Sequence, residues 1–150
     1  MKKVIKNGFY IFLPIILGSI VGFIISDKID YQILNKPPLS PPKILFPIIW
    51  SIIYLLMGIS YKLFRNNSDE KLGIIFYYSQ LIVNLLWSII NFVFKWRFVS
   101  ILWIILLDIL VIITMSIFKK HNSKSYYLLI PYLIWILFAT YLTIGIFILN

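Results

Sequence analysis

The sequence contains no cysteine, a single histidine and five acidic residues among its 150 positions. Without cysteine the chain forms no disulfide and has neither a thiolate nucleophile nor a cysteine-ligated metal site. It also lacks a glycine-rich phosphate loop and any set of a nucleophile, a histidine and a carboxylate. Charged residues make up 13% of the chain, against about 25% in ordinary soluble domains. We therefore expect neither a soluble globular domain nor a metal site, and no intrinsic cofactor.

The chain is rich in apolar residues, which make up 61% of it and give a mean hydropathy of +0.96. They form five long, nearly charge-free runs, and a helix needs about 20 such residues to cross a bilayer. The runs are continuously apolar rather than alternating, which favours helices over barrel strands. We predict an all-α membrane protein with a single domain, residues 1–150, and a bundle of five transmembrane helices at 8–26, 44–61, 72–94, 98–118 and 126–149.

Positive charge is concentrated in the connections between these runs. The net charge of +9 is explained by basic loops that orient helices and contact lipid headgroups, so we expect no nucleic-acid partner. Nine Lys and Arg residues fall on the side of the N-terminus and five on the opposite side. The positive-inside rule then predicts a cytoplasmic N-terminus and an external C-terminus.

Two connections constrain the arrangement of the helices. Residues 95–97 form so short a link that the third and fourth helices must be antiparallel neighbours. The segment 27–43 contains four prolines, which restrict the backbone and predict a semi-rigid connection.

Amide side chains gather on one face of the third predicted helix. Gln80, Asn84, Trp87 and Asn91 lie within about 60° of one another at 100° per residue. Interhelical hydrogen bonds, worth about 0.6–2 kcal/mol each in membranes, are one interpretation. A polar patch on the wall of a ligand pocket is the other, and the periodicity does not choose between them.

Aromatic residues gather on two further faces. Phe46, Trp50 and Tyr54 follow one another at four-residue spacing in the second predicted helix. The fifth predicted helix carries a second such face, formed by Tyr132, Trp135, Ala139 and Thr143. Trp135 lies too deep for the interfacial belt in which tryptophans usually occur. These faces predict either aromatic core packing or a flat pocket for a planar apolar ligand.

Two other features of the spans concern packing. Asp108 lies at the centre of the fourth run, where a carboxylate costs about 2.5–3.5 kcal/mol. We expect it to face the bundle, against the amides of the third helix or in protonated form. Gly18 and Gly22 form a GxxxG pattern that permits close helix approach, within the bundle or across a dimer.

Several blocks of sequence resemble the tryptophan-rich sensory protein/translocator protein family, formerly called the peripheral benzodiazepine receptor. The blocks are KPPLSPP at 36–42, FPIIW at 46–50, YLLMG at 54–58, QLIVNLLW at 80–87, PYLIW at 131–135 and FATYL at 138–142. They occur in the family's order and cover essentially the whole chain. The resemblance implies a five-helix bundle, usually a homodimer, that binds tetrapyrroles such as protoporphyrin IX and haem.

The resemblance also implies a pocket below the first loop. Its lining would include Trp50, Asn84, Trp87, Trp135 and Ala139, with Pro41 and Pro42 shaping a lid. The same helical faces add Phe46, Tyr54 and Gln80 to the candidate ligand-binding residues. Lys28, Lys36 and Lys43 lie near the expected mouth, where they would meet the propionates of a porphyrin.

We therefore expect a membrane receptor or sensor for a porphyrin or another planar apolar ligand. One alternative is an enzyme that degrades protoporphyrin in light, for which the resemblance implicates Trp50 and Trp135. The other alternative is a transporter of a tetrapyrrole or another amphiphile. The excess of Lys over Arg indicates a bacterial source, and hence a bacterial cytoplasmic membrane.

Overall fold

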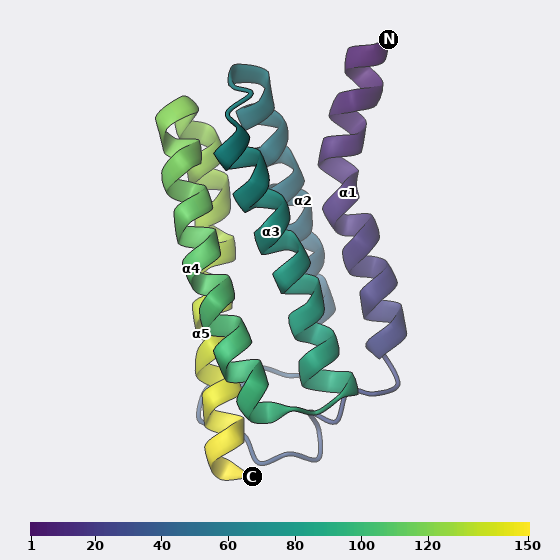
Figure 1. The fold of residues 1–150 in the computed structure, drawn as a ribbon. Helices are drawn as coiled ribbons and strands as arrows, with labels where there is room; N and C mark the ends of the chain where they lie inside the picture. Colours follow the sequence, from purple (N-terminus) through teal and green to yellow (C-terminus); the bar gives the residue numbers. More distant parts are fainter.

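The computed structural model describes all 150 residues as an all-helical bundle (Figure 1). The elements are α1 (Lys2–Ile25), α2 (Leu45–Asn67), α3 (Lys71–Ser88) with its π-helical continuation η1 (Ile89–Val93), α4 (Arg97–His121) and α5 (Ser123–Leu149). Five helices are long and apolar enough to cross a membrane, counting α3 and η1 as one. The expected fold class is therefore confirmed.

The helices extend beyond the apolar runs that predict them. α2 continues to Asn67, and α5 begins at Ser123, where the Asn122 side chain accepts hydrogen bonds from the backbone N–H groups of Lys124 and Ser125. An apolar run marks the part of a helix that lipid can cover, whereas capping residues decide where the helix ends. As a result, only residues 68–70 separate α2 from α3, and only Asn122 separates α4 from α5.

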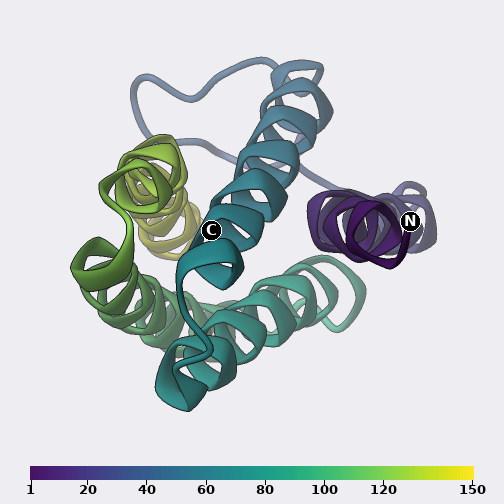
Figure 2. The same cartoon turned by 90° about the horizontal axis from the view of Figure 1, so that it is seen from above.

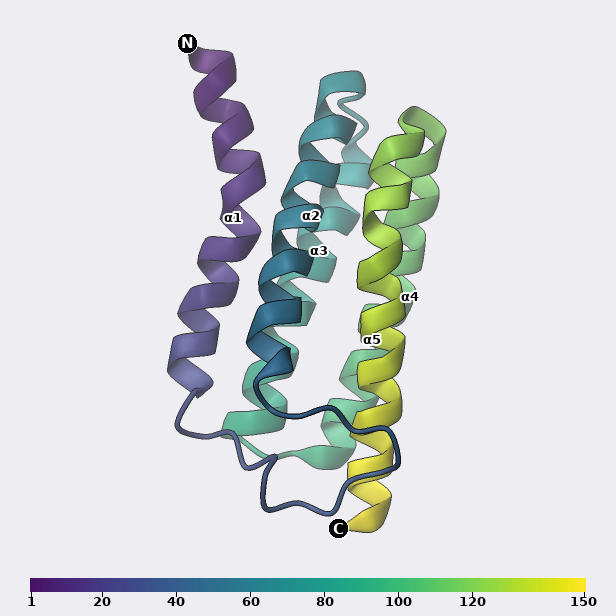
Figure 3. The same cartoon turned by 180° about the vertical axis from the view of Figure 1, so that it is seen from behind.

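The helices pack in a ring in which α1 contacts α2, α2 contacts α5, α5 contacts α4 and α4 contacts α3. Seen from above, α1 stands at the edge of this ring (Figure 2). The N-terminus lies at one end of the bundle, and the C-terminus, the α3–α4 turn and the 26–44 loop share the other (Figures 1 and 3). The expected antiparallel pairing of α3 with α4 is present.

Four buried aromatic rings pack together toward the end of the bundle that carries the α2–α3 connection. Tyr61 stacks on Tyr77 with ring centroids 4.0 Å apart, and Phe64 stacks on Phe118 at 4.3 Å. We call these four buried rings the aromatic stack. Gly73 makes room for it, because a Cβ at this position would overlap the Phe64 ring.

Asp108 contacts the neighbouring helix α5 within the bundle. The Thr140 hydroxyl of α5 donates a hydrogen bond to the Asp108 carboxylate at 2.8 Å, so the acid faces α5 and the expected contact with the α3 amides is wrong.

The two glycines of the GxxxG pattern in α1 differ in their surroundings. Gly18 faces the Tyr54 ring, which a Cβ would overlap, whereas a Cβ at Gly22 would meet no atom within 4 Å. The Gly18 half of the pattern therefore serves packing of α1 on α2.

Candidate functional site

A cavity of about 760 Å³ lies at the loop end of the bundle. Its walls come from α1, α2, α5, the end of α3 with η1, the first residue of α4 and the 26–44 loop, and more than half of its lining residues are hydrophobic. Ligand pockets commonly enclose about 300–1,000 Å³ and are predominantly apolar. The cavity therefore has the size and lining of a site for a small organic molecule.

The α2 wall of the cavity is aromatic. Phe46, Trp50 and Tyr54 all line it, as their four-residue spacing places them on successive turns of one helix face. Trp50 stacks on Tyr54 with centroids 5.4 Å apart and ring planes 28° apart. Trp135 meets Trp50 edge-on at 6.4 Å but is not itself among the lining residues. One indole thus belongs to the cavity surface and the other supports it.

The opposite wall comes from α3, η1 and α5. Trp87 and Ala139 line the cavity, as do two further polar residues of the predicted faces, Asn91 and Thr143. Trp87 is nearly buried, and its ring packs edge-on against Phe92, another residue of the lining. This wall is therefore mixed, with an indole and small polar groups exposed to the same space.

The amides of Gln80 and Asn84 lie behind the cavity rather than on its surface. The Tyr54 hydroxyl donates to Asn84 Oδ1 at 2.6 Å, and Asn84 Nδ2 donates to the Tyr132 hydroxyl at 2.9 Å. That hydroxyl in turn donates to Gln80 Oε1 at 2.8 Å. We call this chain the polar network; it joins α2, α3 and α5 and favours the interhelical interpretation for these two amides.

The 26–44 loop covers the cavity end and is fixed to the bundle at several points. The Tyr141 hydroxyl of α5 donates to the Pro38 carbonyl at 2.8 Å, and the backbone N–H of Asn35 donates to Asn150 Oδ1 at 3.0 Å. Within the loop, the Tyr31 hydroxyl donates to the Pro41 carbonyl at 2.7 Å. These contacts agree with the semi-rigid connection that the prolines predict.

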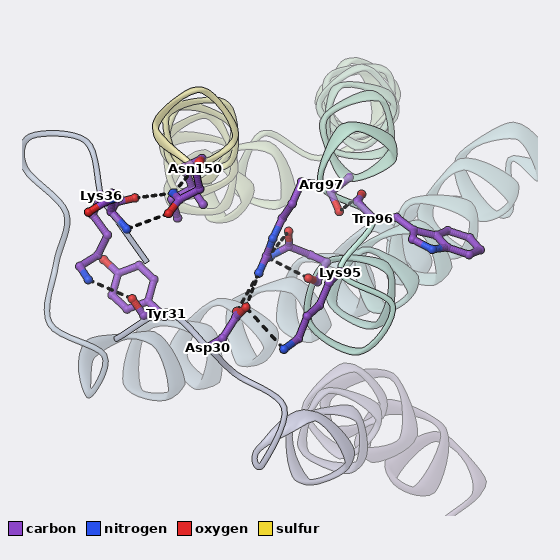
Figure 4. Close-up of polar contacts among 11 residues, drawn as sticks. Asp30, Tyr31, Lys36, Lys95, Trp96, Arg97 and Asn150 are labelled. Carbon is purple, nitrogen blue, oxygen red and sulfur yellow. Dashed lines mark hydrogen bonds and ion pairs between the residues drawn. The ribbon is translucent and has the colours of Figure 1, made fainter. Parts of the chain in front are cut away.

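The predicted lid prolines and lysines do not all face the cavity. Pro41, Pro42 and Lys36 line a second, smaller hollow on the loop. The Lys36 ammonium donates to the Tyr31 carbonyl (Figure 4) and to the Leu34 carbonyl. Lys28 pairs with its neighbour Asp27. Of the three lysines expected at the mouth, only Lys43 lines the large cavity.

Arg97, at the start of α4, lines the cavity although the sequence singled it out only as a loop charge. Its Nη2 donates to both carboxylate oxygens of Asp30, at 2.8 and 2.6 Å, and its Nη1 donates to the backbone and side-chain oxygens of Asn91. Lys95 Nζ lies 3.6 Å from the same carboxylate (Figure 4). The only signal in the sequence is that Arg97 is one of two arginines in the chain, and its partner lies 67 residues away.

Burial of Asp30 alone would raise the pKa of its carboxyl, but the hydrogen bonds and charge of Arg97, with the charge of Lys95, outweigh burial and lower it. The acid is therefore ionised at neutral pH. An ionised Asp30 bound to Arg97 ties the loop to the α3–α4 turn.

A sequence profile of the TspO/MBR family matches residues 10–149. The chain belongs to the TspO/MBR family. It is 39% identical over 123 residues to the tryptophan-rich protein TspO of Archaeoglobus fulgidus, covering 80% of this chain and 79% of that protein. It is 34% identical over 124 residues to the tryptophan-rich protein TspO of Chlorobaculum tepidum, covering 80% and 78%. Protein CrtK of Rhodobacter capsulatus is 33% identical over 143 residues, covering 93% and 89%.

Family membership and the five apolar helices together make this TspO/MBR protein an integral membrane protein. The family that the sequence blocks indicate is confirmed. Apolar side chains cover the outside of the bundle, and Phe9, Phe12, Ile16 and Ile20 on α1 are each more than half exposed. In this TspO/MBR protein they form the surface that lipid chains cover.

Proposed function

We propose that this TspO/MBR protein is a membrane receptor or sensor that binds a porphyrin-type tetrapyrrole, such as protoporphyrin IX or haem, in its cavity. The observation that carries the proposal is the α2 wall, where Phe46, Trp50 and Tyr54 present aromatic rings to one apolar space of about 760 Å³. A planar macrocycle would gain affinity there from apolar burial and from contact with the rings. The polar network behind Tyr54 would hold the wall in place.

We further propose that the protein lies in a bacterial cytoplasmic membrane with its N-terminus in the cytoplasm. The excess of Lys and Arg at the N-terminal end of the bundle supports this orientation. The cavity would then lie toward the outer face of the membrane. The homodimer that the family resemblance implies stays a prediction.

Titration of the purified protein with protoporphyrin IX, followed by the absorbance of the bound ring, tests the proposal. Trp50→Ala removes a ring from the cavity wall, and we expect affinity to fall about tenfold, because loss of one stacking surface costs about 1–3 kcal/mol. Trp96→Ala is the matched control, since Trp96 is exposed on the α3–α4 turn and does not line the cavity. Equal affinities for the two variants would contradict the proposed site.

Light-dependent degradation of protoporphyrin is a second candidate function. It is favoured by the position of Trp50, which lines the cavity and contacts both Tyr54 and Trp135. An indole at the cavity surface would lie close enough to a bound porphyrin to exchange an electron with the excited ring. Illumination of the complex in the presence of dioxygen would give new absorbing products. Products that persist in both Trp50→Phe and Trp135→Phe would count against this function.

A further inference from the structure

The charged side chains on the cavity lining are of one sign, although Asp30, just outside the lining, pairs with Arg97. The lining contains two cationic side chains, Lys43 and Arg97, and no acidic one. Cations beside an apolar space are costly unless an anion accompanies them. The lining therefore suits a ligand with an apolar body and an acidic edge.

Arg97 is held in position by groups that belong to the bundle. Its Nη1 donates to the Asn91 carbonyl at 2.9 Å and to Asn91 Oδ1 at 3.2 Å. Asn91 lies in the π-helical turn η1, and its backbone and side-chain oxygens both accept from this one guanidinium nitrogen. The second guanidinium nitrogen, Nη2, is thereby fixed, and the two N–H groups of Nη2 form a donor pair for a carboxylate through charge-assisted hydrogen bonds.

Asp30 of the loop occupies that donor pair in this structure (Figure 4). The side chains of Asp30 and Arg97 are only 13% and 19% exposed. Lys95, whose side chain is 52% exposed, lies at 3.6 Å on the other side of the carboxylate. The cluster thus contains two cations and one anion, which leaves one positive charge beside the cavity.

We propose that Arg97 is the recognition site for a carboxylate of the cavity ligand and that Asp30 is its internal competitor. This inference rests on the proposed function and assigns the ligand class as an acidic one. The ligand carboxylate replaces Asp30 on Nη2, and Asp30 stays paired with the Lys95 ammonium. One carboxylate replaces another, so the exchange needs no unpaired charge. Binding of an acidic ligand then frees the loop from the α3–α4 turn.

A comparison of protoporphyrin IX with its dimethyl ester tests the proposal, because the two share a ring and differ only in their carboxylates. Affinities are measured on the full chain in detergent or nanodiscs. We expect the diacid to bind about tenfold more tightly than the ester. Arg97→Gln should reduce that ratio to about one by weakening the diacid alone. Asp30→Asn should strengthen diacid binding about 3- to 10-fold and leave the ester unchanged, because the competitor is removed while Asn91 still holds Arg97.

Asp27→Asn is the matched control for Asp30→Asn. It removes the same charge from the same loop, at a carboxylate that is 71% exposed and paired only with Lys28. An equal gain in Asp27→Asn would show a general charge effect and overturn the proposal. An equal gain in affinity for the diacid and the ester in Asp30→Asn would also overturn it, because Asp30 would then only tether the loop. So would a preference for the diacid that persists in Arg97→Gln.

Arg97→Lys serves if Arg97→Gln does not fold, since it keeps the charge and loses the planar donor pair. A diacid preference as strong as that of the wild type in this variant would overturn the proposal. Failure of the proposed function has a different signature, because neither porphyrin would then bind to the wild type. Binding of both porphyrins with equal affinity would leave the proposed function standing and refute the role of Arg97.

Discussion

Aromatic side chains gather near both ends of the bundle, and they are used differently at each. In the aromatic stack, Tyr61, Phe64, Tyr77 and Phe118 lie ring on ring and are at most 1% exposed. At the loop end, Phe46, Trp50 and Tyr54 leave one side of the wall facing a cavity. The connections at the two ends also differ. Near the stack, three residues join α2 to α3 and one joins α4 to α5, whereas the cavity end carries the 19-residue loop 26–44 beside the short α3–α4 turn, residues 94–96.

The difference shows that the aromatic content of a helix does not decide between core and pocket. Short connections draw α2, α3, α4 and α5 together until their rings meet. A long loop that is fixed at its own sites, such as Tyr141 and Asn150, lets the helix ends stand apart and covers the space between them.

Removal of a ring from each region gives the largest expected contrast. Phe64→Ala should lower the free energy of unfolding by about 3–5 kcal/mol, because the residue is fully buried and packed on Phe118. Trp50→Ala should cost less than about 2 kcal/mol, since part of its ring faces the cavity. Reversible unfolding in mixed micelles measures both. Affinity for protoporphyrin should fall more in Trp50→Ala than in Phe64→Ala. If Phe64→Ala had the larger effect on both stability and affinity, the two regions would not differ in role.

Gly58 of α2 and Gly22 of α1 allow a second comparison, between a tightly packed helix contact and the cavity lining. Gly58→Ala places a Cβ against the backbone carbonyl of Ile11, which cannot move aside as a side chain does, so we expect a loss of about 1–3 kcal/mol. Gly22→Ala places a Cβ where nothing lies within 4 Å, on the cavity lining. Helix propensity predicts a gain of about 0.5–1 kcal/mol there. Thermal unfolding of the two variants side by side measures these opposite signs.

The polar network offers an intermediate effect. Asn84→Ala leaves the hydroxyls of Tyr54 and Tyr132 without their shared partner, and we expect a loss of stability of about 1–2 kcal/mol. Affinity for protoporphyrin should fall less than in Trp50→Ala, because Asn84 does not line the cavity. Unchanged stability with abolished binding would instead identify Asn84 as a ligand contact.

The sequence was sufficient to predict the helices and their inward faces, because both follow from apolar length and from a 100° repeat. The periodicity that groups Gln80 with Trp87 does not say how deep each lies on its face. The first enters the polar network and the second reaches the cavity. Depth depends on how neighbouring helices pack, which is not a property of one helix.

Contacts between distant segments could not be predicted from the sequence, because they too depend on how the elements pack. Asp30 and Arg97 meet because the 26–44 loop and the α3–α4 turn share one end of the bundle (Figure 4). The count of Lys and Arg used Arg97 only by its sign and its side of the membrane, and it did not use Asp30. Likewise, the apolar run gave no indication of the π-helical turn that contains Asn91, or of the hydrogen bond between Asn91 and Arg97.

The smallest expected effect is local and depends on pH. The charged groups that pair with Asp30 are Arg97 and Lys95. Because the pKa of Asp30 is lowered in the folded protein, its contribution to loop attachment is fully present above the ordinary aspartate pKa of about 3.9. It is lost as pH falls through the lower folded value. Hydrogen exchange in residues 28–36, corrected for intrinsic rates, should therefore show constant protection from pH 7 to pH 5 and a loss below about pH 4.

Asp30→Asn is the control for that loss, because it lacks the ionisable group at every pH. We expect its loop to exchange faster than the wild type at pH 7 and to approach the wild-type rate in acid. The aromatic stack contains no acid, so its amides should keep their protection over the same range. Protection lost at both ends together would mean that acid unfolds the bundle as a whole, whereas loss at the loop alone would locate the mobile part of the molecule over the cavity.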